Sequence, residues 1–507
     1  MEELEVRESI AGGIFFQYAN SVSYVLAGFI FYIYIIHFYT SELVGVVALL
    51  LAITSLLNIS FSLGINYGLQ HFISFHLGKR EFGEMRYMIR RFSLIGLGLS
   101  FASLVFLYFT SPVFAMLFFH SVKYVTLVRF LGIDLFFMVL ATVLSGILIG
   151  LQNFRSQAVW NIVGILISYS LPVILLFLYS NPIFIVIGWA SGYGLSALAY
   201  GILIFGKLRN SNFNGDIHSH DKVFSYAFPI FLSSLIGYGA AYVDRFVVSY
   251  LLNLSLLGIY NFALLISSAI AFVVGPFGTI LLPKLSEMYG LDRKEDFKNY
   301  VSKGIELMSS IYVPIAMLVA SLSSSILLFL SSGAYLPASI PVMIVLVSSS
   351  VFVSGNILAV SLQGIRKTRI FLLTSSFALL SNFILSILLI PRYQMIGASI
   401  GYSSISAVSF VIMYYYARKF NTLKFEGRKV AKIYLSATVM FIVIFLLQAA
   451  IHYSPLRLFL LIFLGFAIYI GMMKVLRTFD SGDIDFIMVL VPEWMQKIKN
   501  VISILFL

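Results

Sequence analysis

The sequence has no cysteine and few charged residues. The absence of cysteine from all 507 residues excludes disulfides, thiolate metal sites and a cysteine nucleophile. Charged residues make up 11% of the chain and hydrophobic residues 60%. Ordinary globular chains have about 25% charged and about 45–50% apolar residues. So little charge is untypical of a soluble protein, and lipid is the expected solvent.

Sequence motifs for catalysis are also missing. No P-loop and no paired acidic glycosyltransferase motif lies between the apolar runs. The scattered His, Asp and Glu residues lack the spacing of metal ligands. We therefore expect no metal, no cofactor and no catalytic residue, and a transporter rather than an enzyme.

Long apolar runs fill most of the sequence. A helix needs about 20 apolar residues to cross a bilayer, and such a run occurs about 14 times. The predicted fold class is an all-α integral membrane protein of about 14 transmembrane helices, multi-pass in the cell (plasma) membrane. The candidate spans are 9–36, 43–70, 92–119, 128–150, 158–178, 182–206, 224–250, 256–282, 305–331, 338–361, 369–391, 395–417, 433–451 and 456–474.

The basic residues are distributed unevenly over this map. Of the 33 Lys and Arg residues, about 28 fall on the side that holds the N-terminus and every second loop. The other side holds only Lys123, Arg129, Arg245, Arg392 and Arg457. The positive-inside rule then predicts that both termini are cytoplasmic and that the number of spans is even. The net charge of +12 follows from this topology, and no nucleic-acid partner is expected.

The two halves of the sequence resemble each other at an offset of about 209–213 residues. An even number of spans in each half gives both halves the same orientation, so we predict two parallel six-helix repeats followed by a pair of helices. The matched residues are Gly45 with Gly258, Gly78 with Gly290, Gln152 and Arg155 with Gln363 and Arg366, Gly188 with Gly397, and Gly192 with Gly401.

The repeat predicts a domain organisation. Parallel half-bundles imply a cleft near the bilayer midplane, where transported substrates usually bind. The final segment Pro492–Leu507 has helical apolar spacing and is predicted to be an interfacial amphipathic helix. The predicted parts are an N-terminal half at 1–207, a cytoplasmic linker at 208–222, a C-terminal half at 223–420, helices 13 and 14 at 421–476, and a cytoplasmic tail at 477–507.

An ordered series of short motifs extends over residues 9–420. The series consists of Leu63-Gly64, Gly78-Lys79, the stretch Ser145–Gln152, the stretch Tyr226–Pro229, Val243-Asp244-Arg245, the stretch Leu257–Tyr260, and the stretch Leu282–Leu285. In this order it resembles the polysaccharide-biosynthesis (Wzx-like) lipid-linked oligosaccharide flippases of the multidrug/oligosaccharidyl-lipid/polysaccharide exporter superfamily.

The resemblance implies a function. It predicts a flippase that moves a polyprenyl-linked oligosaccharide or polysaccharide repeat unit from the inner to the outer leaflet by alternating access. Membrane lipid and the lipid-linked glycan are the expected partners, and glycan-assembly enzymes are candidate partners. Two alternatives stay open: a multidrug or small-molecule exporter of the same superfamily, and a membrane-embedded glycan polymerase or ligase.

Few charged residues lie inside the predicted spans, where a charge costs at least about 2.5–3.5 kcal/mol. Arg129, Asp134, Asp244 and Arg245 are the candidates for intramembrane charges with a gating role. For the two arginines the alternative is an interfacial residue that snorkels to the headgroups. Arg129 and Asp134 are five residues apart, a spacing that does not favour a pair within one helix.

Polar residues suited to a sugar or a pyrophosphate occur in spans expected to line the cleft. The alternative for each is an ordinary hydrogen bond between helices. The candidate substrate-cavity residues are Gln17, Asn20, Asn66, Tyr67, Gln70, Tyr260 and Asn261. The repeated cytoplasmic motif of Gln152, Arg155, Gln363 and Arg366 either closes helix ends or attracts headgroups.

Overall fold

The computed structural model describes residues 2–210, 223–271, 274–331, 333–424, 427–450 and 453–479, apart from the side chains of 2–15, 17, 18, 210, 275–277, 279 and 280. The described residues contain helices and turns and no strand, which confirms the all-α fold class. Most of the predicted linker, nearly all of the tail with its amphipathic helix, and the side chain of Gln17 lie outside the described residues.

The chain divides into two compact units, Met1–Gly239 and Ala240–Leu507. The division falls within helix α8, which spans Val223–Leu251. The division into repeats, linker and appended helices stays a prediction, and we describe each unit by itself.

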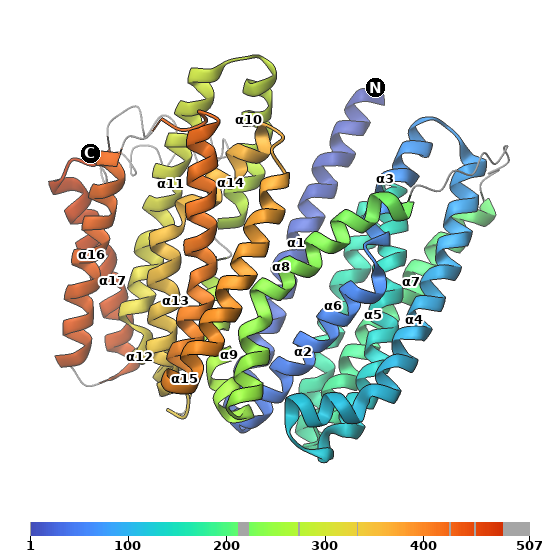
Figure 1. The fold of residues 1–507 in the computed structure, drawn as a ribbon, viewed down its shortest axis with the longest axis horizontal. Coiled ribbons are helices and arrows are strands. Elements are labelled where there is room, and N and C mark those ends of the chain that lie inside the picture. Colours follow the sequence, from blue (N-terminus) through green and yellow to red (C-terminus); the bar gives the residue numbers. More distant parts are fainter. Residues whose placement is uncertain are drawn as a thin grey trace. The chain divides into compact units, whose positions relative to one another are not determined.

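Unit 1 is built around helix α5, which packs against α2, α3, α4 and α7, while α1 packs against α6 (Figure 1). Helices form here because lipid offers no partners for backbone amides and carbonyls. The elements are α1 (Glu2–Phe38), α2 (Ser41–Ser62), α3 (Ile65–Gly78), α4 (Phe82–Phe119), η1 (Val122–Tyr124), α5 (Val125–Gly150), α6 (Phe154–Tyr179), α7 (Ile183–Asn210) and the first part of α8.

Unit 2 is built around helix α11, which packs against α10, α13, α14 and α16. The appended helices α16 and α17 pack against each other and against α11. The elements after α8 are α9 (Leu254–Ala271), α10 (Gly275–Gly290), α11 (Lys294–Ser321), α12 (Ser323–Leu330), η3 (Leu336–Ala338), α13 (Ser339–Phe352), α14 (Ser354–Gly364), α15 (Arg369–Lys419), α16 (Gly427–Ala450) and α17 (Pro455–Val475).

The second predicted span of each half is divided in two. The span expected at 43–70 is α2 followed by α3, and the span expected at 256–282 is α9 followed by α10. Between α2 and α3, Leu63 and Gly64 have φ angles of 50° and 67°, which end the helix. A Cβ on Gly64 would lie 2.9 Å from the carbonyl oxygen of Ala227 in α8. The close approach of α8 therefore requires glycine at this turn.

Helix α15 is a hairpin of two antiparallel helices. Its 51 residues would extend roughly 76 Å as one straight helix, far more than the membrane thickness. Gln394 interrupts it with φ 49° and ψ −126°. The halves then pack together, with the Ser381 and Ser404 hydroxyls 2.9 Å apart. They correspond to the spans predicted at 369–391 and 395–417.

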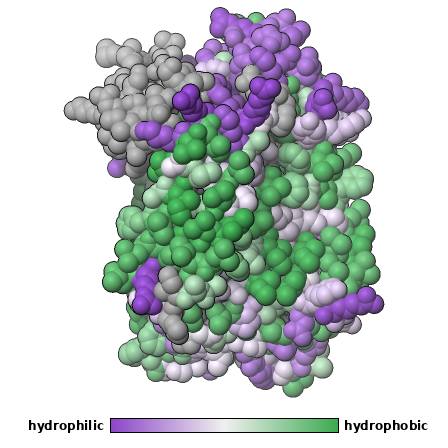
Figure 2. Space-filling model, turned by 90° about the vertical axis from the view of Figure 1, so that its left-hand side faces the viewer, coloured by the Kyte–Doolittle hydropathy of each residue, from purple (hydrophilic) through white to green (hydrophobic). Residues whose placement is uncertain are grey.

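The helices are long and apolar enough for a multi-pass membrane protein. Among the described residues, 12 helices could cross a membrane, or up to 13 if the bent pair Leu336–Phe352 and Ser354–Gly364 is one span. Figure 2 shows one face, on which a broad band of hydrophobic residues separates hydrophilic ends. The number 14 and the cytoplasmic placement of both termini stay predictions.

At least four turns between helices share one geometry. Arg80 and Gln152 in unit 1, and Asp292 and Arg366 in unit 2, have φ between 54° and 62°. At each turn the next residue's amide donates to the carbonyl five residues earlier, the pattern of a Schellman motif. The turns recur in the same order in both units. In this order of turns, Arg366 holds the position in unit 2 that Gln152 holds in unit 1. Gln363, which matches Gln152 in the sequence repeat, lies three residues earlier, in α14.

Candidate functional site

A buried polar cluster joins α8, α9 and the first half of α15 in unit 2. The Tyr260 hydroxyl donates to Asp244 Oδ2 at 2.6 Å. Asn382 Nδ2 donates to Asp244 Oδ1 at 3.4 Å and to the Ala240 carbonyl at 2.9 Å. Asp244, Tyr260 and Asn382 are each 0% exposed. The Asp244 carboxylate is thus held by donors from two other helices, which offsets its removal from water.

The neighbouring arginine is held by the same helices. Arg245 Nε donates to Asn261 Oδ1 at 3.1 Å, and Nη1 donates to the Ala241 carbonyl at 2.7 Å. Its guanidinium carbon lies 4.2 Å from the centre of the Tyr242 ring. The side chain is 9% exposed, so the structure places it in the interior of unit 2. We call Asp244, Arg245, Tyr260, Asn261 and Asn382 the Asp244 cluster.

A cavity of about 570 Å³ lies among α9, α11, α13, α14 and α15. Half of the residues that line it carry a hydroxyl or an amide, and we call it the serine-rich cavity. The hydroxyls of Tyr312 and Ser349 are 2.8 Å apart at its wall. Tyr402, another lining residue, interacts electrostatically with Asp244 and Arg245. The cavity therefore adjoins the Asp244 cluster.

The sequence interpretation missed this cavity and the role of Asn382. A signal was present in the second half of α15, where Tyr402, Ser406, Ser409 and Met413 recur at helical spacing and all line the cavity. Asn382 lies 138 residues from Asp244 in the sequence, and no local pattern connects the two.

Asp134 of α5 lies in the interior of unit 1. It is 1% exposed, and within the described part of the chain its Oδ1 has no hydrogen-bond partner. A cavity of about 40 Å³ adjoins it, lined also by Thr54, Asn161 and Tyr193. A water needs about 10–15 Å³ of such space, so the cavity has room to hydrate the carboxyl group.

Arg129 has its contacts on a different helix from Asp134. Arg129 is exposed, and its Nε donates to the Ser111 hydroxyl of α4 at 3.3 Å. Its guanidinium carbon lies 5.1 Å from the centre of the Tyr108 ring. The two charges of α5 thus have separate surroundings, as their spacing predicted.

The other predicted cavity residues are distributed over both units. In unit 1, Asn20 accepts a hydrogen bond from Asn161 Nδ2 at 2.8 Å, so it connects α1 to α6. Tyr67 is 43% exposed, while Asn66 and Gln70 are half-buried. In unit 2, Tyr260 and Asn261 belong to the Asp244 cluster. Whether these residues line a common cleft stays a prediction.

The residues of the repeated cytoplasmic motif are all exposed. Gln152 and Arg366 are the left-handed residues of two Schellman turns. Gln363 and Arg155 are exposed beside them, and the Arg155 guanidinium carbon lies 5.6 Å from the centre of the Phe16 ring. The left-handed conformation of Gln152 and Arg366 fits a role in ending the helices. An attraction of the motif to lipid headgroups stays a prediction.

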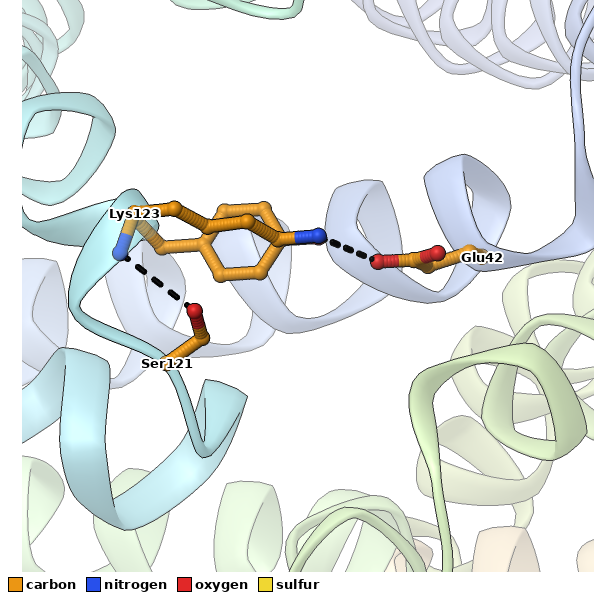
Figure 3. A network of polar contacts seen from close by, with 4 residues as sticks. Glu42, Ser121 and Lys123 are labelled. Atoms are coloured by element: carbon orange, nitrogen blue, oxygen red, sulfur yellow. Dashed lines mark hydrogen bonds and ion pairs between the residues drawn. The ribbon is translucent and has the colours of Figure 1, made fainter.

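An exposed ion pair connects the start of α2 to the turn after α4 (Figure 3). Lys123 Nζ donates to Glu42 Oε1 at 2.9 Å, and the Tyr124 hydroxyl donates to the same oxygen at 2.6 Å. The Lys123 amide lies 3.4 Å from the Ser121 hydroxyl oxygen. Since exposed pairs contribute about 0–1 kcal/mol, this contact orients the turn more than it stabilises the fold.

The sequence profile described as polysaccharide biosynthesis protein matches residues 10–289, more than half of the chain. The chain belongs to the polysaccharide biosynthesis protein family. The family resemblance drawn from the ordered motifs is thereby confirmed.

This polysaccharide biosynthesis protein has curated relatives in archaea and bacteria. The probable low-salt glycan biosynthesis flippase Agl15 of Haloferax volcanii is 21% identical over 291 residues, which are 55% of this chain. The matched region spans only 61% of that relative's length. The capsular polysaccharide biosynthesis protein CapF of Staphylococcus aureus is 25% identical over 283 residues, 54% of this chain and 67% of that protein.

Two solved structures share the fold of this polysaccharide biosynthesis protein. The lipid II flippase MurJ in an inward closed conformation has a TM-score of 0.73 at 19% identity, covering 91% of this chain and 98% of that one. An inward-facing multidrug resistance MATE family transporter of the MOP superfamily has a TM-score of 0.65 at 15% identity, covering 79% and 95%. At these identities the likeness shows the fold, that of a multi-pass cell-membrane protein.

Proposed function

We propose that this protein is a flippase that moves a polyprenyl-linked oligosaccharide or polysaccharide repeat unit from the inner to the outer leaflet by alternating access. The observation that carries the proposal is the serine-rich cavity, a hydroxyl-lined space of about 570 Å³ among membrane-spanning helices. Family membership and a curated relative named as a glycan biosynthesis flippase support the same cargo class.

Alternating access requires parts that move as rigid bodies. The Asp244 cluster supports this mechanism because it joins α8, α9 and α15 through buried hydrogen bonds to charged groups, which are strong in a low-dielectric interior. The first of the two parallel repeats predicted from the sequence would be the second rigid body. Glycan-assembly enzymes would deliver the cargo on the cytoplasmic side.

The two alternative functions receive less support. A drug exporter commonly binds cations, yet within the described part of the chain no acidic side chain lines the serine-rich cavity. A glycan polymerase or ligase needs a sizeable outer loop for its catalytic residues. The turns after Phe38, Tyr179 and Leu251 reach the next helix within a few residues, and they leave no room for such a domain.

Depletion of the protein in its source organism tests the proposal. Lipid-linked glycan should accumulate on the cytoplasmic leaflet, where it becomes accessible to a glycosidase added to inside-out vesicles. Re-expression should restore export. Unchanged glycan export together with altered drug resistance would contradict the proposal and favour the exporter.

A further inference from the structure

We propose that the serine-rich cavity binds the neutral sugar part of the cargo and excludes its phosphate. This inference rests on the proposed function, which it deepens by assigning the glycan to a cavity contained within unit 2. A volume of about 570 Å³ falls within the range of about 300–1,000 Å³ typical of organic ligands. A single water or ion, at about 30 Å³, would leave most of this space unfilled.

The charge of the lining argues for a neutral ligand. Among the described residues, no Lys, Arg, Asp or Glu lines the cavity. A phosphate buried there would lack the cations that charge-assisted hydrogen bonds need. A cationic ligand would lack a carboxylate to offset its desolvation. An uncharged, polar molecule is the ligand class that this lining fits.

The hydroxyls are arranged to accept hydrogen bonds from a polyol. Ser267 donates to the Ala263 carbonyl at 2.9 Å, and Thr374 donates to the Ile370 carbonyl at 2.8 Å. Because their protons are engaged with the helix backbone, their oxygen lone pairs remain for donors from a ligand. The hydroxyl of Ser403, another lining residue, is buried and has no hydrogen-bond partner in the described part of the chain.

Aromatic rings provide the second element of sugar recognition. Phe352 and Phe410 line the cavity with ring centroids 5.6 Å apart and planes inclined by 43°. Phe371 lines it from the first half of α15. Rings of this kind offer flat apolar surface to the C–H face of a pyranose, while the hydroxyls take its polar edge.

The natural lack of cysteine makes a thiol-protection experiment possible. A Ser406→Cys variant carries one thiol in the cavity, and a Ser302→Cys variant carries one at a half-buried position of α11 outside it. Each is purified in nanodiscs and labelled with N-ethylmaleimide. Three probes share one tail: farnesyl lactoside with a neutral disaccharide, farnesyl diphosphate, and farnesyl trimethylammonium.

We expect the lactoside alone to protect the cavity thiol. At a concentration about ten times its Kd, labelling of Ser406→Cys should slow about tenfold, while the other two probes change the rate less than about twofold. Ser302→Cys should label at one rate throughout. Protection by the diphosphate or the ammonium equal to that by the lactoside, or no protection by any probe, would overturn the inference.

A second reporter keeps the test independent of one variant. Ser409→Cys should show the same order of protection, and adding Ser406→Phe should abolish it because the ring takes the space next to the reporter thiol, one helical turn away. Flipping in the leaflet assay without protection by the lactoside would refute the sugar site and leave the proposed function standing. Protection of the thiol by the lactoside without flipping in the leaflet assay would support the sugar site and refute the proposed function.

Discussion

Replacing Tyr260 by Phe removes one hydroxyl from the interior of unit 2 and leaves the ring in place. That hydroxyl donates to Asp244 Oδ2 at 2.6 Å, and both residues are 0% exposed. A hydrogen bond to a charged group contributes about 1.5–3 kcal/mol, and water cannot readily replace the donor at a fully buried site. We therefore expect Tyr260→Phe to lower the free energy of unfolding by roughly 2–3 kcal/mol.

Tyr469→Phe is the matched control. Tyr469 is also a buried residue, but its hydroxyl donates to the uncharged Ser310 carbonyl at 3.0 Å. Loss of a neutral hydrogen bond costs about 1 kcal/mol. Thermal unfolding of both variants in the same detergent, followed by size exclusion after heating, should show the larger decrease in Tm for Tyr260→Phe.

A double-mutant cycle separates the charge from the packing. In an Asp244→Asn background, Tyr260→Phe should cost about as little as Tyr469→Phe, because the acceptor no longer carries a charge. The assignment of a buried carboxylate network would be refuted if Tyr260→Phe were no more destabilising than Tyr469→Phe. An equal cost of Tyr260→Phe in the wild-type and Asp244→Asn backgrounds would refute it too.

Three further substitutions give defined outcomes. Gly64→Ala should lower the free energy of unfolding by about 1–3 kcal/mol in thermal melts, since φ is 67° and the Cβ would meet backbone at 2.9 Å, whereas Gly78→Ala has open space and should be tolerated. Asp134→Asn should leave Tm almost unchanged, because Asp134 Oδ1 has no hydrogen-bond partner among the described residues; a large decrease would show an interaction that this structure lacks. Glu42→Gln should cost less than about 1 kcal/mol, and the difference from wild type should vanish in high salt.

The candidate site shows which functional residues local sequence patterns can identify. Asp244, Arg245, Tyr260 and Asn261 were found individually, because polar residues inside apolar spans are rare and costly. Their grouping was not predicted: two were assigned to gating and two to a substrate cavity, and the structure brings all four into one cluster with Asn382. The reason is that hydrogen-bond partners on different helices are separated by stretches of sequence that carry no signal of the pairing.

The membrane class, the position of nearly every helix and the family could be predicted from the sequence alone. Each of these follows from properties of consecutive residues. Backbone groups in lipid must be satisfied within a segment, so an apolar run of sufficient length becomes a helix. The ordered motifs lie within such segments or at their ends, and the profile match over residues 10–289 confirmed the family.

Where the helices break and which polar groups meet depend on tertiary packing. The turn at Gly64 depends on the approach of α8 to α3, and the hairpin of α15 depends on packing between its own halves. The serine-rich cavity has the same origin. A serine facing a cavity and a serine facing a neighbouring helix both donate to the preceding turn of their own helix, so the sequence around them is alike and only the packing distinguishes them.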